Sequence, residues 1–188
     1  MTVTATILAN AATVASACIS LLALIISLIS MFSSRQALRL ARQQEERRQP
    51  LLVPYLSEGY VKFEQDHTRL YAFLTSVSSR SDSDNSIAEI YLNLTYISAA
   101  DASITVTLPS NSQLAAAFPG TSGSPLAIPT HVGAHQTVLG WCYFRADGNI
   151  VTSAKSIESH LIVFRDSHGI DATLRPIMIQ EYARETLS

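Results

Sequence analysis

Two histidines, His131 and His135, have the spacing that most resembles a metal site in this chain. A separation of four residues places two imidazoles on one side of a helix, as in zinc-binding helices. Pro129 and Gly133 disfavour a helix across this stretch, and the glutamate of an HExxH motif is absent. We therefore expect two loop histidines and no bound metal.

A second acidic pattern, formed by Asp82, Asp84 and Asn85, resembles the start of a calcium-binding loop. An EF-hand loop that began at Asp82 would need glycine at its sixth position and glutamate at its twelfth. Ile87 and Asn93 occupy these positions. The pattern therefore predicts a solvated loop.

Nucleotide-binding and nucleophilic motifs are missing from the sequence. The glycine-containing stretch Pro119–Pro125 lacks the Gly-Lys-Ser/Thr ending of a phosphate-binding loop, and no serine lies in a G-x-S-x-G elbow. The formal net charge of −2 predicts no general attraction to nucleic acid. We expect no cofactor, no small-molecule substrate and no nucleic acid. An enzyme is the least favoured hypothesis, and it would need a pocket that joins His131 or His135 to Asp166.

Trp141 and Tyr143 share one face of a predicted strand with Leu139. Such a row of aromatic residues can form an exposed binding strip, because aromatic side chains anchor interfaces. It can equally belong to a hydrophobic core, and this is the interpretation that we favour.

The elements that would position these residues are strands, expected over residues 51–188. Ile87–Ile97 alternates clearly, with Ile90, Leu92 and Leu94 on one side of the strand. Asp147-Gly148 predicts a hairpin turn. Many short strands without interleaved helices indicate a mainly β, immunoglobulin-like β-sandwich, without the cysteine pair of true immunoglobulin domains. After Pro176 the sequence leaves a last strand and a short helix as alternatives. The predicted strands are Leu51–Leu56, Tyr60–Phe63, Arg69–Val77, Ile87–Ile97, Ser103–Leu108, Leu126–Ile128, Thr137–Phe144, Ile157–Arg165 and Ile170–Leu174.

Residues 1–34 contain no charged side chain, and the stretch Thr13–Phe32 is rich in large aliphatic residues. About 20 apolar residues suffice to cross a bilayer, so the pattern predicts an N-terminal transmembrane helix. A cleaved signal peptide and a lipoprotein signal ending at Cys18 are the two alternatives. We reject both, because a basic N-terminal region is missing and the most apolar stretch follows Cys18.

Residues 35–50 predict a basic juxtamembrane helix that ends at Pro50. Arg35, Arg39 and Arg42 lie at the C-terminal end of the predicted span, and no basic residue precedes it. The positive-inside rule then places the N-terminus outside and the β domain in the cytoplasm, at the plasma or inner membrane. The same arginines could contact anionic lipid head groups.

Small residues recur every three or four positions along the predicted span, which places them on one helix face. Small side chains let two membrane helices approach closely, so this face predicts a homo-oligomer or another protein partner packed on the helix. The residues are Ala12, Ser16, Ser20, Ala23, Ser27 and Ser30.

The whole layout resembles that of small bacterial single-span membrane proteins with a short linker helix and a β-sandwich domain. The resemblance implies the architecture and supplies no activity. We therefore expect a membrane-anchored, non-catalytic protein-binding or scaffolding module. The alternative is a small accessory subunit of a larger membrane complex.

Overall fold

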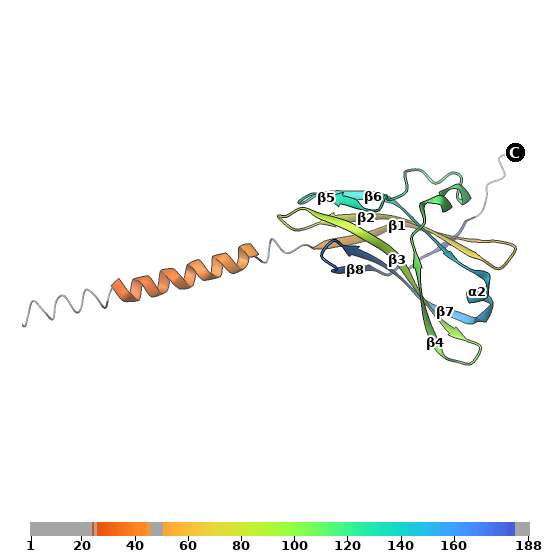
Figure 1. Ribbon diagram of the computed structural model, residues 1–188, viewed down its shortest axis with the longest axis horizontal. Helices are drawn as coiled ribbons and strands as arrows, with labels where there is room; N and C mark the ends of the chain where they lie inside the picture. Colours follow the sequence, from red (N-terminus) through yellow and green to blue (C-terminus); the bar gives the residue numbers. More distant parts are fainter. Residues whose placement is uncertain (1–23, 25, 46–50, 183–188) are drawn as a thin grey trace, which may run out of the picture. The chain divides into compact units, whose positions relative to one another are not determined.

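The computed structural model describes residue 24, residues 26–45 and residues 51–182. The chain forms two compact units, Met1–Arg47 and Arg48–Ser188. Among the described residues, the first unit contains one helix, and the second contains the strands (Figure 1).

No helix in the described part of the chain is long and apolar enough to cross a membrane. The longest apolar run of the N-terminal helix ends at Phe32, and the helix then carries Arg35, Arg39 and Arg42. The absence of such a helix from the described residues contradicts the predictions of a transmembrane helix over residues 1–34, of a single-pass membrane protein, and of a single-pass membrane location with a cytoplasmic domain. Residues 1–23 and 25 of the predicted span lie outside the described residues.

Nine strands and two short helical segments are described in the second unit. They are β1 (Leu52–Phe63), β2 (Arg69–Ser79), β3 (Asn85–Ser98), β4 (Ser103–Pro109), the 3-10 helix η1 (Ser112–Ala117), β5 (Thr130–Val132), β6 (Thr137–Ala146), α2 (Gly148–Ser153), β7 (Ala154–Asp166), β8 (Asp171–Leu174) and β9 (Gln180–Glu181).

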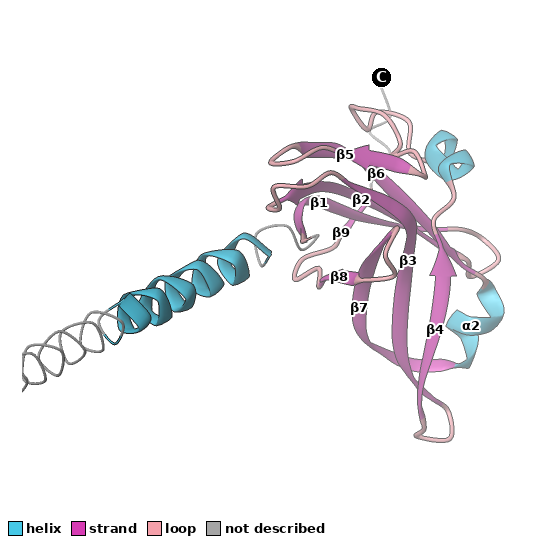
Figure 2. Ribbon diagram, turned by 60° about the vertical axis from the view of Figure 1, so that its left-hand side comes forward, coloured by secondary structure: helices cyan, strands magenta, loops and turns pink. Residues whose placement is uncertain are grey.

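The strands form two sheets, and the prediction of a mainly β domain with two sheets is confirmed (Figure 2). One sheet has the order β6-β2-β1-β9. The other has the order β4-β3-β7-β8, with β5 paired to β3. Immunoglobulin-type sandwiches place strands A, B and E side by side in one sheet and G, F, C and C′ in the other. The runs β1-β2-β6 and β8-β7-β3-β4 follow that order.

The main core lies between the two sheets and follows from the alternation of side chains along each strand. Ile90, Leu92 and Leu94 of β3 are buried, whereas Glu89 and Tyr91 face outward, as the sequence pattern predicts. The buried members contributed by the other strands include Leu52, Tyr71, Phe73, Val77, Leu108, Cys142, Phe144, Ile162 and Phe164.

A second hydrophobic cluster covers the opposite face of β2 and β6. Trp141 is 1% exposed and Tyr143 is 2% exposed, and both pack with Leu70 and Phe118. The segment that contains η1 lies over them, and the Trp141 Nε1–H donates a hydrogen bond of 2.8 Å to the Ser122 carbonyl. The two aromatic residues are core residues, although they lie outside the space between the sheets.

Three local predictions differ from the structure. The two strands predicted before Phe63 form the single strand β1, which has a register shift between Leu56 and Glu58. Residues 126–128 form no strand, and only an isolated bridge joins the neighbouring Pro125 to Trp141. Asp147-Gly148 begins helix α2 instead of a hairpin, because β6 and β7 belong to different sheets and a two-residue turn joins only adjacent strands.

Candidate functional site

Strand β1 lies almost at the edge of its sheet, and among the described strands only the short β9 pairs with its outer side. The Leu51 carbonyl accepts a hydrogen bond of 3.0 Å from the Arg80 N–H, so the backbone groups of Leu51 face β2. Backbone groups alternate between the two sides of a strand. Those of Leu52, Pro54 and Leu56 therefore point away from β2, and among these Pro54 has no N–H to donate.

Strand β9 covers only the far end of this edge. It runs parallel to β1 and pairs Tyr60 with Gln180 and Val61 with Glu181. The Tyr182 N–H adds a hydrogen bond of 2.8 Å to the Val61 carbonyl. The edge of β1 therefore accepts an added parallel strand at residues 60–61, and β9 does not reach residues 52–56.

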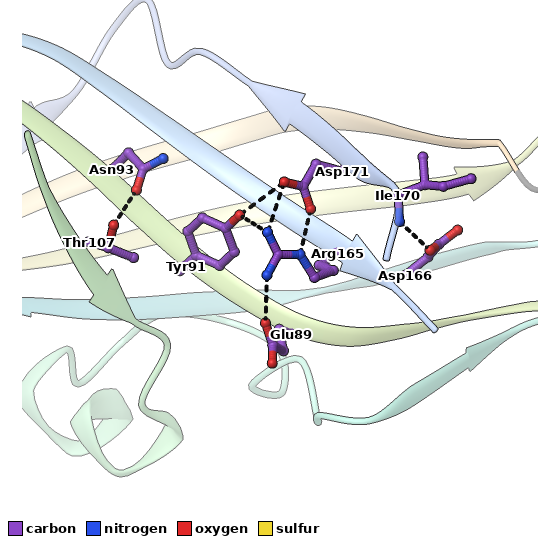
Figure 3. A network of polar contacts seen from close by, with 8 residues as sticks. All are labelled: Glu89, Tyr91, Asn93, Thr107, Arg165, Asp166, Ile170 and Asp171. Carbon is purple, nitrogen blue, oxygen red and sulfur yellow. Dashed lines mark hydrogen bonds and ion pairs between the residues drawn. The ribbon is translucent and has the colours of Figure 1, made fainter. Parts of the chain in front are cut away.

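Strand β8 forms the facing edge of the other sheet and is fastened there by Arg165 (Figure 3). The guanidinium of Arg165 donates to both carboxylate oxygens of Asp171, at 2.8 and 3.0 Å. It also donates to the Tyr91 hydroxyl at 2.9 Å and to Glu89 at 3.4 Å. Hydrogen bonding to Arg165 lowers the pKa of Asp171, and hydrogen bonding to Asp171 raises the pKa of Arg165. This network holds the first residue of β8 against β7.

The turn before β8 is ordered by Asp166, which is 3% exposed. One carboxylate oxygen accepts from the backbone N–H groups of His168 and Ile170, both at 2.8 Å. The other accepts from Asn85 Nδ2 at 3.1 Å. These bonds satisfy the buried carboxylate and fix the turn that carries Ile170.

Two successive hollows lie along the line where β1 and β8 run side by side. The first has a volume of about 520 Å³ and lies between residues 56–60 and the segment that includes Leu174, Ile177 and Met178. The second, of about 300 Å³, lies between residues 51–54 and the segment 170–173, with Asp166. We call the two hollows together the edge groove.

The edge groove gathers four of the exposed large hydrophobic side chains of this unit. Ile177 is 94% exposed, Met178 71%, Leu51 53% and Ile170 49%. Apolar side chains that line a concave surface beside free backbone donors and acceptors are typical of a surface that binds an extended segment.

The loop residues considered for metal binding form two exposed histidine–aspartate pairs that are separate from each other. His135 Nε2 lies 2.8 Å from Asp82 Oδ1, and His131 Nε2 lies 3.9 Å from Asp84 Oδ2. Within the described ranges, no group of three or more His, Cys, Asp or Glu side chains could hold a metal ion. Asp166 accepts hydrogen bonds from Asn85 and from the backbone N–H groups of His168 and Ile170.

The predicted helix-packing residues fall partly outside the described residues. Ala12, Ser16, Ser20 and Ala23 lie there, and nothing tests their packing. Ser27 and Ser30 are exposed on the N-terminal helix, and so are the predicted lipid-facing residues Arg35, Arg39 and Arg42. A partner on this helix stays a prediction.

The sequence did not predict the edge groove, because its two walls come from segments near the two ends of the domain, far apart in the chain. One signal was available: Pro54 interrupts an otherwise regular strand pattern, and proline is confined to edge strands, the first residue of a strand or bulges. Nothing in the sequence pairs that edge with residues 170–178.

Comparisons with known proteins do not assign this chain to a family. No family model and no curated protein matches the sequence. Among solved structures, a Bacillus subtilis protein named as a lipoprotein, ycdA, is similar with a TM-score of 0.43 and 8% sequence identity. The similarity covers 67% of this chain and 36% of that one, so the present chain spans about a third of its length. A similarity at this level carries no functional argument.

Proposed function

We propose that the protein is a non-catalytic protein-binding module that receives an extended segment of a partner along the edge groove. The observation that carries the proposal is the coincidence of the free β1 edge with four exposed apolar side chains in two hollows. A bound strand would hydrogen-bond to the outward backbone groups of Leu52 and Leu56 and to the carbonyl of Pro54.

Burial of apolar side chains should contribute more to the binding free energy of a partner segment than the backbone hydrogen bonds do. A hydrogen bond contributes about 0.5–1.5 kcal/mol net, whereas full burial of one Ile, Leu or Met side chain contributes roughly 1.5–3 kcal/mol. Ile177 and Met178 in the first hollow, and Leu51 and Ile170 in the second, are large, exposed hydrophobic side chains that a bound segment could cover. Part of this gain offsets the loss of freedom on association.

The spacing of the two hollows specifies the partner. From Leu51 to Leu56 an extended chain rises about 3.3 Å per residue, which separates the hollows by roughly 17 Å. Side chains on one face of a strand recur every second residue. We expect the partner segment to be extended, about six to eight residues long, with large apolar residues four or six positions apart.

The test is selection of peptides from a displayed random library on the full chain, followed by affinity measurements with the enriched peptides. Ile177→Asp and Ile170→Asp are the test variants, because both side chains are exposed and their replacement leaves the core intact. Leu139→Asp is the matched control, because Leu139 is 63% exposed on β6 and lies outside both hollows.

We expect enriched peptides with the apolar spacing described above, at least a tenfold loss of affinity in each groove variant, and unchanged affinity in the control. Binding that survives both groove variants, or that the Leu139 variant weakens equally, would contradict the proposal. So would a selection that enriches no peptide.

A further inference from the structure

Strand β4 forms a sheet edge that lies at the other end of its sheet from β8 and the edge groove. Among the described strands it pairs only with β3, without a register shift. The Ser110 N–H, directly after β4, donates a hydrogen bond of 3.0 Å to the Ile90 carbonyl, so the even-numbered residues turn their backbone groups towards β3. Backbone groups alternate between the two sides of a strand. The N–H and C=O groups of Ser103, Thr105 and Thr107 therefore point away from β3.

The β4 edge lacks the protection that the other sheet edges of the described domain have. The Leu126 N–H donates to the Trp141 carbonyl at 2.8 Å and so covers the outer side of β6. Strand β1 carries Pro54 and is partly covered by β9, and β8 has only four residues. Strand β4, with the sequence SITVTLP, has no charged residue, and its proline is the last residue. Uncharged edge strands rich in β-favouring residues pair readily with another strand.

The free backbone groups of β4 are complementary to those of a second β4. A two-fold axis requires the same surface on both copies, so that each residue contacts its symmetric counterpart. An antiparallel pair centred on Thr105 places Thr105 opposite itself and Ser103 opposite Thr107 of the second copy. All three residues have outward backbone groups, and opposed residues of this kind exchange two hydrogen bonds. The ladder would therefore contain about six backbone hydrogen bonds.

The same register covers an apolar side chain that the single chain leaves open. Ile104 lies on the face of β4 that also carries Val106 and Leu108, and these two pack on the main core. Leu108 is 6% exposed, whereas Ile104 is 39% exposed. In the pairing centred on Thr105, Ile104 lies opposite Val106 of the second copy, in a pair without backbone bonds, where side chains approach most closely. Dimerisation would therefore cover Ile104 on both copies.

Both ends of the ladder are set by residues that flank it. Pro109 has no N–H, and it would lie opposite Asp101 of the second copy, which is in a turn with a positive φ of 57°. The ladder therefore extends over residues 103–107 and stops there. Glu158 accepts a hydrogen bond of 3.1 Å from the Ser103 hydroxyl. Because Ser103 is at the end of the ladder, the two Glu158 carboxylates of a dimer would lie at opposite ends of the interface.

We propose that two copies of this chain associate by antiparallel pairing of their β4 strands, which joins the two β4-β3-β7-β8 sheets into one. The interface is short, so the dimer is weak and reversible, with a dissociation constant on the order of 10–100 μM. The edge groove of each copy lies at the far edge of the joined sheet and stays open. The failure of either proposal leaves the other standing.

The first test is sedimentation velocity of the full chain over a range of concentrations that extends well above this dissociation constant. Thr105→Lys places two positive charges side by side on the two-fold axis and should raise the dissociation constant about tenfold or more. Thr137→Lys is the matched control. Both threonines are exposed on edge strands and bond to a neighbouring hydroxyl, Thr105 to Thr95 at 2.9 Å and Thr137 to Ser78 at 2.7 Å. A wild type that stays monomeric, or equal association of the wild type and Thr105→Lys, would overturn the proposal.

The second test determines the register by disulfide formation in a Cys18→Ser background, where the remaining Cys142 is 0% exposed. Opposed residues that exchange backbone bonds have Cα atoms about 5.5 Å apart, a separation that a disulfide bridges. Thr105→Cys should therefore form a covalent dimer under oxidised glutathione, as seen by electrophoresis without reductant. Ser103→Cys, exposed on the same face of β4, is the control and should cross-link far less, because it lies opposite Thr107. Cross-linking of Ser103→Cys to the same extent, or none in Thr105→Cys, would overturn the proposed pairing.

Discussion

His160 shows how burial changes the chemistry of a single side chain. The imidazole lies against Tyr71 and has its pKa lowered from 6.5 to about 4, first by burial and then by the charge of Arg69. The folded chain therefore binds a proton less readily than the unfolded chain does. The contribution of His160 to stability is complete above pH 6.5 and is lost as the pH falls towards 4.

His160→Gln should remove this pH dependence. The wild type is expected to lose on the order of 1–2 kcal/mol from this source between pH 6.5 and 4, a value reduced for partial exposure of the ring. Urea unfolding at several pH values measures the loss. His168→Gln, in the exposed turn before β8, is the control and should keep the wild-type slope. An unchanged slope in the His160 variant would show that another group titrates.

Gly148 shows a steric requirement of one backbone position. A Cβ atom added there would clash with the Asp66 carbonyl oxygen, because the turn between β1 and β2 packs on the start of α2. Gly148→Ala should therefore cost more than about 2 kcal/mol. Gly169→Ala is the comparison. Gly169 has a positive φ of 79°, but a Cβ atom added there would point into open space, so this substitution should cost only about 1 kcal/mol. Thermal unfolding of the two variants measures both losses of stability. A smaller loss of stability in Gly148→Ala than in Gly169→Ala would refute the steric explanation.

At the scale of elements, Tyr182 fastens the end of the chain to two other segments. Its N–H bonds to Val61 of β1, its hydroxyl donates to the Pro119 carbonyl, and its ring packs edge to face on Tyr60 and Phe118. Strand β9 has only two residues, so these contacts contribute more to its position than the ladder does.

Tyr182→Ala should lower stability by about 1–3 kcal/mol, because it removes two aromatic contacts and a hydrogen bond. Hydrogen exchange should accelerate at residues 118–121 and at Tyr182 itself, with β3 and β7 unaffected. Tyr182→Phe keeps both ring contacts and should lose less than half as much. Equal losses in the two variants would assign the effect to the hydroxyl instead.

The elements also show what sequence patterns predict and what they cannot. The alternation of Ile90, Leu92 and Leu94 predicts β3 because one face of that strand is buried and the other is not. Strands β5 and β9, with three and two residues, are too short to show any alternation. The edge groove arises where distant segments of the chain lie side by side, and a local sequence pattern carries no information on such contacts. The N-terminal stretch was misjudged because its hydropathy dominated the prediction, whereas the described helix is charged along its second half.

At the scale of the whole molecule, the free edge of β1 is a surface at which two copies could pair. Exposed edges are commonly protected by proline, charge or irregularity. In β1 this protection comes from Pro54, which offers no N–H, and from the register shift between Leu56 and Glu58.

Pro54→Val should therefore promote self-association, because it adds an outward N–H and a β-favouring side chain to the edge. Sedimentation velocity over a range of concentrations measures the effect. At equal concentration, we expect a larger fraction of dimers or larger species in the variant than in the wild type. Pro109→Val, at the end of β4, is the control. A variant that sediments as the wild type does would show that Pro54 does not protect the edge.

The buried position of Trp141 has a spectroscopic consequence. The chain contains one tryptophan, so its fluorescence reports on a single place. Because the indole is covered by the segment around η1 and bonded to Ser122, its emission maximum should lie at short wavelength in the folded protein. Detachment of that segment would shift the emission to longer wavelength while circular dichroism from the two sheets persists. If the tryptophan emission changes before the circular dichroism during unfolding, the segment around η1 detaches before the two sheets unfold.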